Sequence, residues 1–148
     1  MPIERVGHVV LRVRDLEASK HFYHDILGMK IANEREDFAV FFRFDDYHHD
    51  IAVFKADEDA APHQKKQVGL AHVALVADSL DTVKAMHQKL KEHDVPIVRM
   101  SDHDYTKSVY FEDPDGNEIE IYCEVPEAPW QALDTVIRSK VLDLETES

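Results

Sequence analysis

The chain has 148 residues, 44% of them hydrophobic, and a formal net charge of -13 at pH 7. This length is that of one domain with an ordinary core, and the negative charge argues against nucleic acid or an anionic membrane surface as a partner. There is no apolar run near the roughly 18 residues of a membrane helix, the N-terminus MPIERVGHVV lacks a signal-peptide core, and the single cysteine favours a reducing compartment. We therefore expect a cytoplasmic protein that handles small molecules.

The first half of the chain reads as a strand, a helix and three further strands. The valine-rich segment 3–13 predicts the first strand. Asp15 is a good N-cap for the helix that follows, and Gly28 is placed to end it as a left-handed C-cap. Three short strands are then expected at residues 29–34, 38–44 and 48–55.

The second half repeats this order of elements. Residues 69–97 predict a strand, a helix capped by Ser79 and the start of another strand after Pro96. Two last strands, KSVYFED and GNEIEIYCEV, flank the turn DPDG, in which Gly116 suits a left-handed position. When the two halves are aligned 64 residues apart, HVVLRVRDL lies over HVALVADSL and His8 falls on His72.

Two such modules predict an α+β domain. One module, of about 55 residues, is too small to bury a sheet alone. Two βαβββ modules are therefore expected to pair into one eight-stranded, cup-shaped mixed sheet with both helices on its outer side. We expect a single domain and a C-terminal helical tail that packs on the body or on another subunit of a homo-oligomer. The predicted ranges are 1–125 for the domain, 3–56 for module one, 57–67 for a linker, 68–125 for module two and 126–148 for the tail.

Three side chains form the candidate metal site. His8 and His72 occupy matching positions of the repeat, and Glu120 on the last strand matches Ala52 of the first module. Two imidazoles and one carboxylate with open positions suit a non-haem Fe(II) site, and the same donors also suit Mn(II), Zn(II) or Ni(II). The competing interpretation is that Glu120 lies on a solvated strand face and that the two histidines are structural.

The sequence resembles the vicinal oxygen chelate superfamily. The resemblance is carried by GHVVLRVRDLEASKHFYHDILGM, GLAHVALVADSLD and VYFEDPDGNEIEIY, and it covers residues 3 to about 124. It implies the paired βαβββ fold and a metal at His8, His72 and Glu120. It does not imply one reaction, because the superfamily includes glyoxalase I, fosfomycin-inactivating thiol transferases, epimerases, extradiol ring-cleavage dioxygenases and metal-free binding proteins.

Local residues separate these alternatives. Glyoxalase I has a fourth ligand, a glutamate, where this chain has Ala52, and the fosfomycin transferases hold a phosphonate with basic residues for which only Arg99 and Lys107 are available. The metal-free binders generally lack the ligand triad that is present here. These differences disfavour glyoxalase I, the fosfomycin transferases and the metal-free binders. A metal-dependent lyase or transferase of the superfamily and a non-catalytic binding protein nevertheless stay open as alternative functions.

The extradiol dioxygenases match at further positions. The resemblance implies that His49, just before the last strand of module one, handles a proton during oxygen chemistry, and that Tyr110, ten residues before Glu120, binds a substrate oxygen. His103 matches a further histidine that contacts the substrate. A surface position for His49 or His103 and a core position for Tyr110 are the alternative interpretations.

The predicted function is therefore Fe(II)-dependent extradiol cleavage, with Mn(II) as the alternative metal and a small aromatic diol and O2 as substrates. Asp104 and Tyr105 follow His103 where smaller residues are expected. This departure is expected to alter the pocket mouth or the substrate range.

Overall fold

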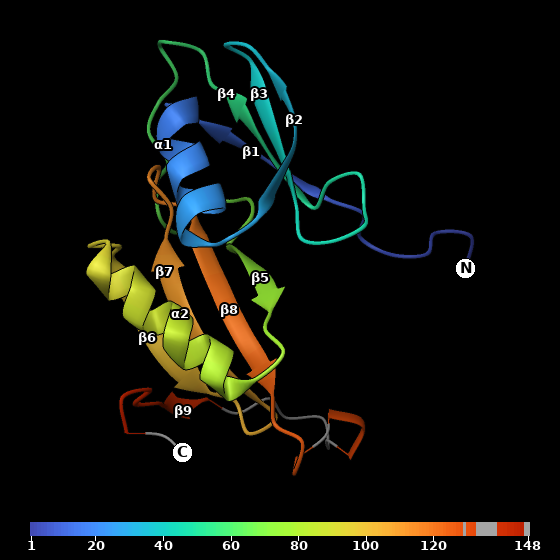
Figure 1. Ribbon diagram of the computed structural model, residues 1–148, viewed down its shortest axis with the longest axis vertical. Helices are drawn as coiled ribbons and strands as arrows, with labels where there is room; N and C mark the ends of the chain where they lie inside the picture. Colours follow the sequence, from blue (N-terminus) through green and yellow to red (C-terminus); the bar gives the residue numbers. More distant parts are fainter. Residues whose placement is uncertain (129, 133–138, 147–148) are drawn as a thin grey trace. The chain divides into compact units, whose positions relative to one another are not determined.

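The computed structural model describes residues 1–128, 130–132 and 139–146 (Figure 1). The chain divides into two compact units, Met1–His63 and Gln64–Ser148. In the described part of the chain, no helix has both the length and the apolar character needed to cross a membrane. The predicted α+β class is confirmed, with one βαβββ module in each unit.

The first unit is a four-stranded sheet with a helix against it (Figure 1). Its strands run in the order β1-β4-β3-β2, with β1 parallel to β4 and the other pairs antiparallel. The elements are β1 (Val9–Val13), α1 (Leu16–Lys20) continued by the π-helical turn η1 (His21–Ile26), β2 (Lys30–Arg35), β3 (Ala39–Arg43) and β4 (Ile51–Lys55).

Local chemistry sets the limits of the first helical segment. The Asp15 carboxylate accepts hydrogen bonds from the backbone N–H groups of Glu17 and Ala18 at 2.9 and 3.2 Å, as an N-cap does. Gly28 has φ +81°, a left-handed conformation that glycine adopts without steric cost. Both predicted caps are confirmed.

The first strand is shorter than predicted. It begins at Val9, where pairing with Ile51 of β4 starts, and residues 3–8 have no strand structure. A strand needs a hydrogen-bonded neighbour for its backbone groups, and β4 offers none before Ile51. His8 therefore lies immediately before β1 rather than within a strand.

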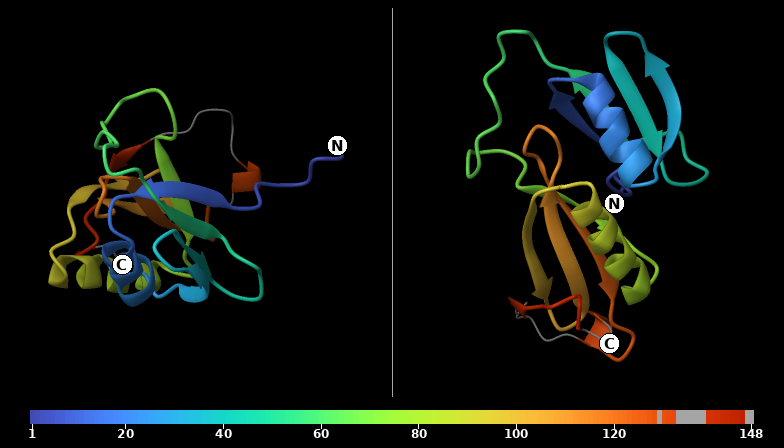
Figure 2. Two further views of the ribbon diagram at one scale, coloured as in Figure 1. Left: turned by 90° about the horizontal axis from the view of Figure 1, so that it is seen from above. Right: turned by 60° about the vertical axis from the view of Figure 1, so that its left-hand side comes forward.

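The second unit is a five-stranded sheet in the order β5-β8-β7-β6-β9. Helix α2 lies along one face of this sheet, against β7 and β8 (Figure 2). The elements are β5 (His72–Val76), α2 (Leu80–Glu92), β6 (Ile97–Asp102), β7 (Thr106–Glu112), β8 (Glu118–Glu124), the 3-10 turn η2 (Trp130–Ala132) and β9 (Lys140–Val141).

The turn between β7 and β8 fixes the register of the two strands that carry the site. The buried Asp113 carboxylate accepts hydrogen bonds from the backbone N–H groups of Asp115 and Asn117 at 2.9 and 2.8 Å, and Gly116 has φ +84°. The predicted left-handed glycine is confirmed. The resulting register places Tyr110 directly opposite Glu120, as the ten-residue spacing predicted.

The described part of the tail differs from the predicted helix. It contains the short turn η2 and the strand β9, which pairs with Ser101 and Asp102 of β6. The predicted helical positions 133–138 lie outside the described residues. The structure has two hydrogen-bonded sheets of four and five strands, so a single eight-stranded cup and the domain ranges 1–125 and 126–148 stay predictions.

Candidate active site

An imidazole and a carboxylate meet on neighbouring strands of the second unit. β5 runs parallel to β8, and His72 and Glu120 point to the same face of this pair. His72 Nε2 lies 3.1 Å from Glu120 Oε2. Glu120 is only 7% exposed, which rules out the interpretation of this residue as a solvated strand face.

A serine orients the buried carboxylate. The hydroxyl of Ser108, on β7, donates a hydrogen bond to Glu120 Oε1 at 2.6 Å, and Ser108 is fully buried. Ser108 thus contacts Oε1 of Glu120, and His72 lies beside Oε2. The Ser108 hydroxyl therefore fixes the orientation of the Glu120 side chain. The sequence offers one signal for Ser108, namely its position two residues before Tyr110, which places both side chains on one face of β7.

Tyr110 and His103 form a second polar pair beside the first. Tyr110 is 4% exposed, and its hydroxyl lies 3.1 Å from His103 Nε2. The His72 ring meets the Tyr110 ring edge-on, with 5.5 Å between the ring centroids. Burial and the adjacent negative charge of Glu120 raise the pKa of Tyr110 to about 12, so the phenol stays protonated at neutral pH.

Arg99 is a further residue of this site that sequence reasoning placed in no cluster. Its guanidinium carbon lies 3.8 Å from the centroid of the Tyr110 ring, and its Nη1 lies 3.3 Å from Glu118 Oε1. Glu118 also lies 3.6 Å from His72 Nδ1. The pairing of β6 with β7 sets Arg99 across from Tyr110, a register that becomes visible only once the bulge between Ile97 and Arg99 is known.

The first unit gathers a separate group of histidines. The ring centroids of His8 and His49 are 4.2 Å apart, and His48 Nδ1 lies 2.8 Å from His49 Nδ1. His49 also packs edge-on against Phe41, at 5.2 Å between centroids. Burial lowers the pKa of His49, and the electrostatic influence of the neighbouring His8 and His48 lowers it further, which favours the neutral His49 imidazole.

The predicted site residues thus fall into two groups. His72, Glu120, Tyr110 and His103 lie together in the second unit, and His8 and His49 lie together in the first. Among the described residues, no group of three or more His, Cys, Asp or Glu side chains is gathered so as to hold a metal ion. The three-ligand site and the roles of these residues therefore stay predictions.

A cavity of about 470 Å³ in the second unit opens onto Glu120 and Tyr110. This volume lies in the range of small-molecule sites. Tyr105, one of the two unexpected residues after His103, contributes to its lining. The lining residues are His103, Tyr105, Thr106, Tyr110, Glu120, Tyr122, Glu124 and Trp130.

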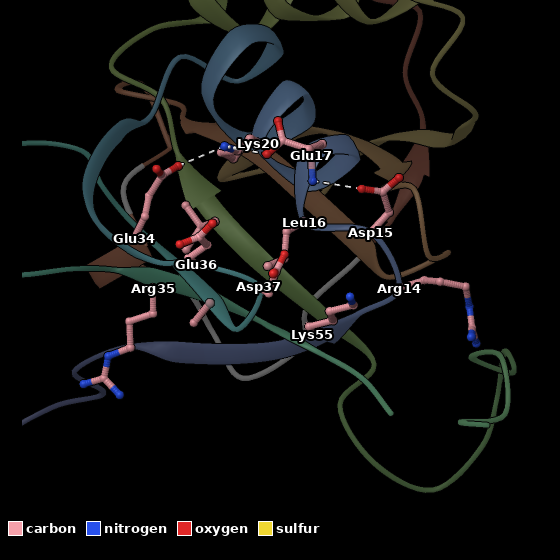
Figure 3. Close-up of a pocket in the computed structure, with 12 residues that line it drawn as sticks. Arg14, Asp15, Leu16, Glu17, Lys20, Glu34, Arg35, Glu36, Asp37 and Lys55 are labelled. Carbon is pink, nitrogen blue, oxygen red and sulfur yellow. Dashed lines mark hydrogen bonds and ion pairs between the residues drawn. The ribbon is translucent and has the colours of Figure 1, made fainter. Parts of the chain in front are cut away.

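A larger cavity of about 810 Å³ in the first unit contains none of the predicted site residues (Figure 3). Its side chains are mostly charged and of both signs. Lys20 lies between Glu17 and Glu34, with nitrogen–oxygen distances of 2.7 and 3.1 Å. Two of the carboxylates that line this cavity are therefore paired with the Lys20 ammonium group.

Fold and site together define an α+β protein of two βαβββ modules with an imidazole–carboxylate pair on neighbouring strands. Residues 5–121 match the Glyoxalase/Bleomycin resistance protein/Dioxygenase superfamily, and the chain belongs to that superfamily. The predicted family is therefore confirmed.

Relatives with two different activities are similarly close to this chain. Biphenyl-2,3-diol 1,2-dioxygenase 3 from Rhodococcus globerulus is 31% identical over 135 residues, which span 88% of this chain and 68% of that protein. Metallothiol transferase FosB from Lysinibacillus sphaericus is 30% identical over 124 residues, which span 82% of this chain and 84% of that protein.

A solved structure supports the fold. The glyoxylase/bleomycin resistance protein/dioxygenase domain from Frankia sp. EAN1pec has a TM-score of 0.71 at 19% identity and covers 84% of this chain and 94% of that chain. Together, the comparisons support a metal-dependent function of this superfamily.

Proposed function

We propose that the protein is an Fe(II)-dependent extradiol dioxygenase that cleaves a catecholic ring next to its two hydroxyl groups. One observation carries most of this proposal. Tyr110 lies opposite the buried Glu120, and its hydroxyl lies within hydrogen-bond distance of His103. A metal ion held by Glu120 could bind both adjacent oxygens of a diol, and the Tyr110 phenol and the His103 imidazole lie beside it to contact those oxygens. The dioxygenase relative supports the same assignment.

The residues present fit a divalent metal ion. His72 Nε2 and Glu120 Oε2 converge to 3.1 Å, and an imidazole with a carboxylate is a donor set for Fe(II) or Mn(II). We propose His72 and Glu120 as two ligands, and His8 as the third because it occupies the matching position of the sequence repeat. Fe(II), when bound, supplies the centre at which the diol and dioxygen react.

The chain's own groups bind the substrate and move protons. The Tyr110 hydroxyl, kept protonated by burial, donates a hydrogen bond to one oxygen of the diol and so favours its ionised form. His103 Nε2 fixes the orientation of that hydroxyl at 3.1 Å. His49, whose pKa burial lowers, is available as a neutral base that takes a proton from the diol and returns it as a general acid.

The first experiment loads the protein anaerobically with Fe(II) and then adds 2,3-dihydroxybiphenyl, catechol, 3-methylcatechol or 4-methylcatechol in air. Oxygen uptake is followed together with the yellow absorbance of the ring-opened product. The proposal expects both signals and expects Glu120→Ala to abolish them. The absence of oxygen uptake with every diol, from protein that holds one metal ion per chain, would remove the dioxygenase assignment.

The second candidate function is a metal-dependent thiol transferase, and Arg99 favours it. This guanidinium lies against Tyr110 beside the proposed ligands, where it could hold an anionic group of a substrate. The FosB relative points in the same direction. Formation of a thiol adduct of fosfomycin by the metal-loaded protein, lost in Arg99→Ala, would favour this function. A glyoxalase-type lyase and a non-catalytic binding protein are the remaining alternatives, and the same metal-loaded samples test both.

We also propose that the protein is a homo-oligomer. In the described part of the chain, β2 is an edge strand whose six residues, Lys30–Arg35, are all exposed. An edge strand with unpaired backbone groups readily accepts a partner. Sedimentation velocity tests this, and a single species at the 17.1 kDa mass of one chain would contradict it.

A further inference from the structure

We propose that the C-terminal tail completes the substrate cavity of the second unit, and that Trp130 with Tyr105 and Tyr122 forms an aromatic wall that binds a flat, uncharged group of the ligand. The proposal rests on the proposed function for the chelating end of that ligand. The aromatic wall is defined by these three side chains, which all line the cavity that opens onto Glu120. The superfamily match ends at residue 121, so Trp130 lies outside it.

The lining of the cavity is divided into a polar and an aromatic part. Glu120, Tyr110 and His103 form the polar part, where two of the three side chains already contact one another. Tyr122 lies two residues beyond Glu120 on β8, so it points to the same face of the sheet. A ligand whose oxygens reach Glu120 would therefore extend past Tyr122 towards Tyr105 and Trp130.

Described residues before and after Trp130 are joined to the second unit. Before it, the Val125 N–H donates a hydrogen bond to the Tyr105 carbonyl at 2.8 Å, which joins the end of β8 to the loop that carries His103. After it, β9 pairs with β6, and Leu142 and Leu144 are each only 2% exposed. These contacts join Val125 and residues 140–144 to the second unit, and Trp130 itself lines the cavity of that unit.

Trp130 is 55% exposed, which is unusual for the largest side chain of the protein. A large exposed aromatic that lines a cavity beside buried polar groups is typical of a binding surface. Tryptophan offers a wide flat face and prefers offset-stacked or edge-on contact with another ring. The exposed face of Trp130 is therefore available to a flat group of the ligand.

The charges of the cavity define the chemistry of that group. The lining includes two carboxylates, Glu120 and Glu124, and no lysine or arginine. An anionic substituent at the Glu124 end of the cavity would meet that carboxylate, with no lysine or arginine among the lining residues there, whereas Arg99 lies at the opposite, Tyr110 part. The ligand class that fits is a diol with a neutral aryl substituent or a fused second ring, in preference to a single-ring diol or one that carries a carboxylate.

Trp130 is the sole tryptophan of the chain, so its fluorescence reports directly on this wall. The experiment measures acrylamide quenching of the metal-loaded protein under anaerobic conditions, with no ligand, with saturating catechol and with saturating 2,3-dihydroxybiphenyl. Binding of each diol is measured separately by equilibrium dialysis. N-acetyltryptophanamide in the same solutions corrects for light absorbed by the diols.

The proposal expects 2,3-dihydroxybiphenyl to lower the quenching constant severalfold and catechol to lower it much less. Quenching that is equal with and without bound 2,3-dihydroxybiphenyl would overturn the aromatic wall, even if the diol is turned over. Shielding of Trp130 by this diol without oxygen uptake would leave the wall in place and remove the dioxygenase assignment. If dialysis shows no binding of either diol, both proposals fail.

A substitution pair gives a kinetic test. Trp130→Ala is expected to raise KM for 2,3-dihydroxybiphenyl about tenfold more than KM for catechol, because one aromatic contact and its buried area are lost. Little change in kcat is expected, since Trp130 contacts the substituent and not the reacting oxygens. Trp130→Phe should restore most of the preference for 2,3-dihydroxybiphenyl over catechol, measured as the ratio of the two KM values. Equal changes in KM for both diols, or no recovery with phenylalanine, would contradict selection by Trp130.

Discussion

Removing the Ser108 hydroxyl is expected to weaken metal binding although no proposed metal ligand is replaced. Ser108 donates to Glu120 at 2.6 Å, and both side chains are buried. Loss of a group that orients a metal ligand typically lowers metal affinity by about 10- to 100-fold. Loss of a hydrogen bond to a charged group also costs about 1.5–3 kcal/mol of stability. Ser108→Ala should show both effects.

Mn(II) serves as the probe for this test because it is stable in air. Isothermal titration calorimetry measures its affinity for the unchanged protein and for Ser108→Ala, and urea unfolding measures their stabilities. Ser19→Ala is the matched control, because Ser19 is equally buried and its hydroxyl makes no hydrogen bond within the described residues. The control should keep its Mn(II) affinity and lose no stability.

If Ser108→Ala is folded by circular dichroism and binds Mn(II) as tightly as the unchanged protein, Glu120 is not a ligand oriented by Ser108. Equal losses of affinity in Ser108→Ala and Ser19→Ala would point to a general effect of buried serines rather than to the site.

Three further predictions concern stability, each measured by urea unfolding. Burial lowers the pKa of His87, so the unfolded chain takes up a proton at this residue more readily than the folded chain when the pH is below about 6.5. The free energy of unfolding should therefore decrease as the pH is lowered, by up to about 1.4 kcal/mol per pH unit. His87→Gln should remove this contribution, whereas the same pH dependence in both proteins would argue against a buried neutral imidazole. Gly28→Ala should cost about 1–2 kcal/mol through its positive φ alone, because no atom lies within 4 Å of the added methyl; unchanged stability would contradict this. Asp113→Ala removes the acceptor of two backbone N–H groups and should cost at least about 1.5 kcal/mol, whereas a smaller loss would show that the turn holds without it.

Much of the fold was predictable because the signals are local. Asp15 and Ser79 are helix caps whose side chains bond to backbone N–H groups within three residues, and Gly28 ends the first helical segment through its own φ. The pairing of Tyr110 with Glu120 was also predictable, since the turn between them fixes the register. In each case, the residues that decide the structure are close in sequence.

The remaining features depend on distant contacts. β1 begins at Val9 because β4 begins at Ile51, which no pattern in residues 3–8 reveals. β9 is a strand of two residues and exists through pairing with β6, so it carries no periodicity of its own. The position of Arg99 against Tyr110 depends on a bulge in β6 that shifts the register. Long-range pairing of this kind is not encoded in a local window.

Part of the candidate site was predictable from the sequence. His72, Glu120 and Tyr110 were identified from the repeat and the resemblance, and the structure brings them together in the second unit. Ser108 and Trp130 were not assigned a role, because a serine on a strand and a tryptophan in a tail have many ordinary explanations. Only the hydrogen bond to Glu120 and the shared cavity single them out.

An extradiol dioxygenase places both atoms of dioxygen in a ring-opened product. The most direct test supplies the Fe(II)-loaded protein with 2,3-dihydroxybiphenyl and isotopically labelled dioxygen, and analyses the product by mass spectrometry. The account predicts two labelled oxygen atoms in each product molecule at first formation, one in the new carboxylate and one in the new carbonyl group, with partial loss of the carbonyl label to water. A product without label, or recovery of the diol unchanged from protein that holds its metal, would contradict the account.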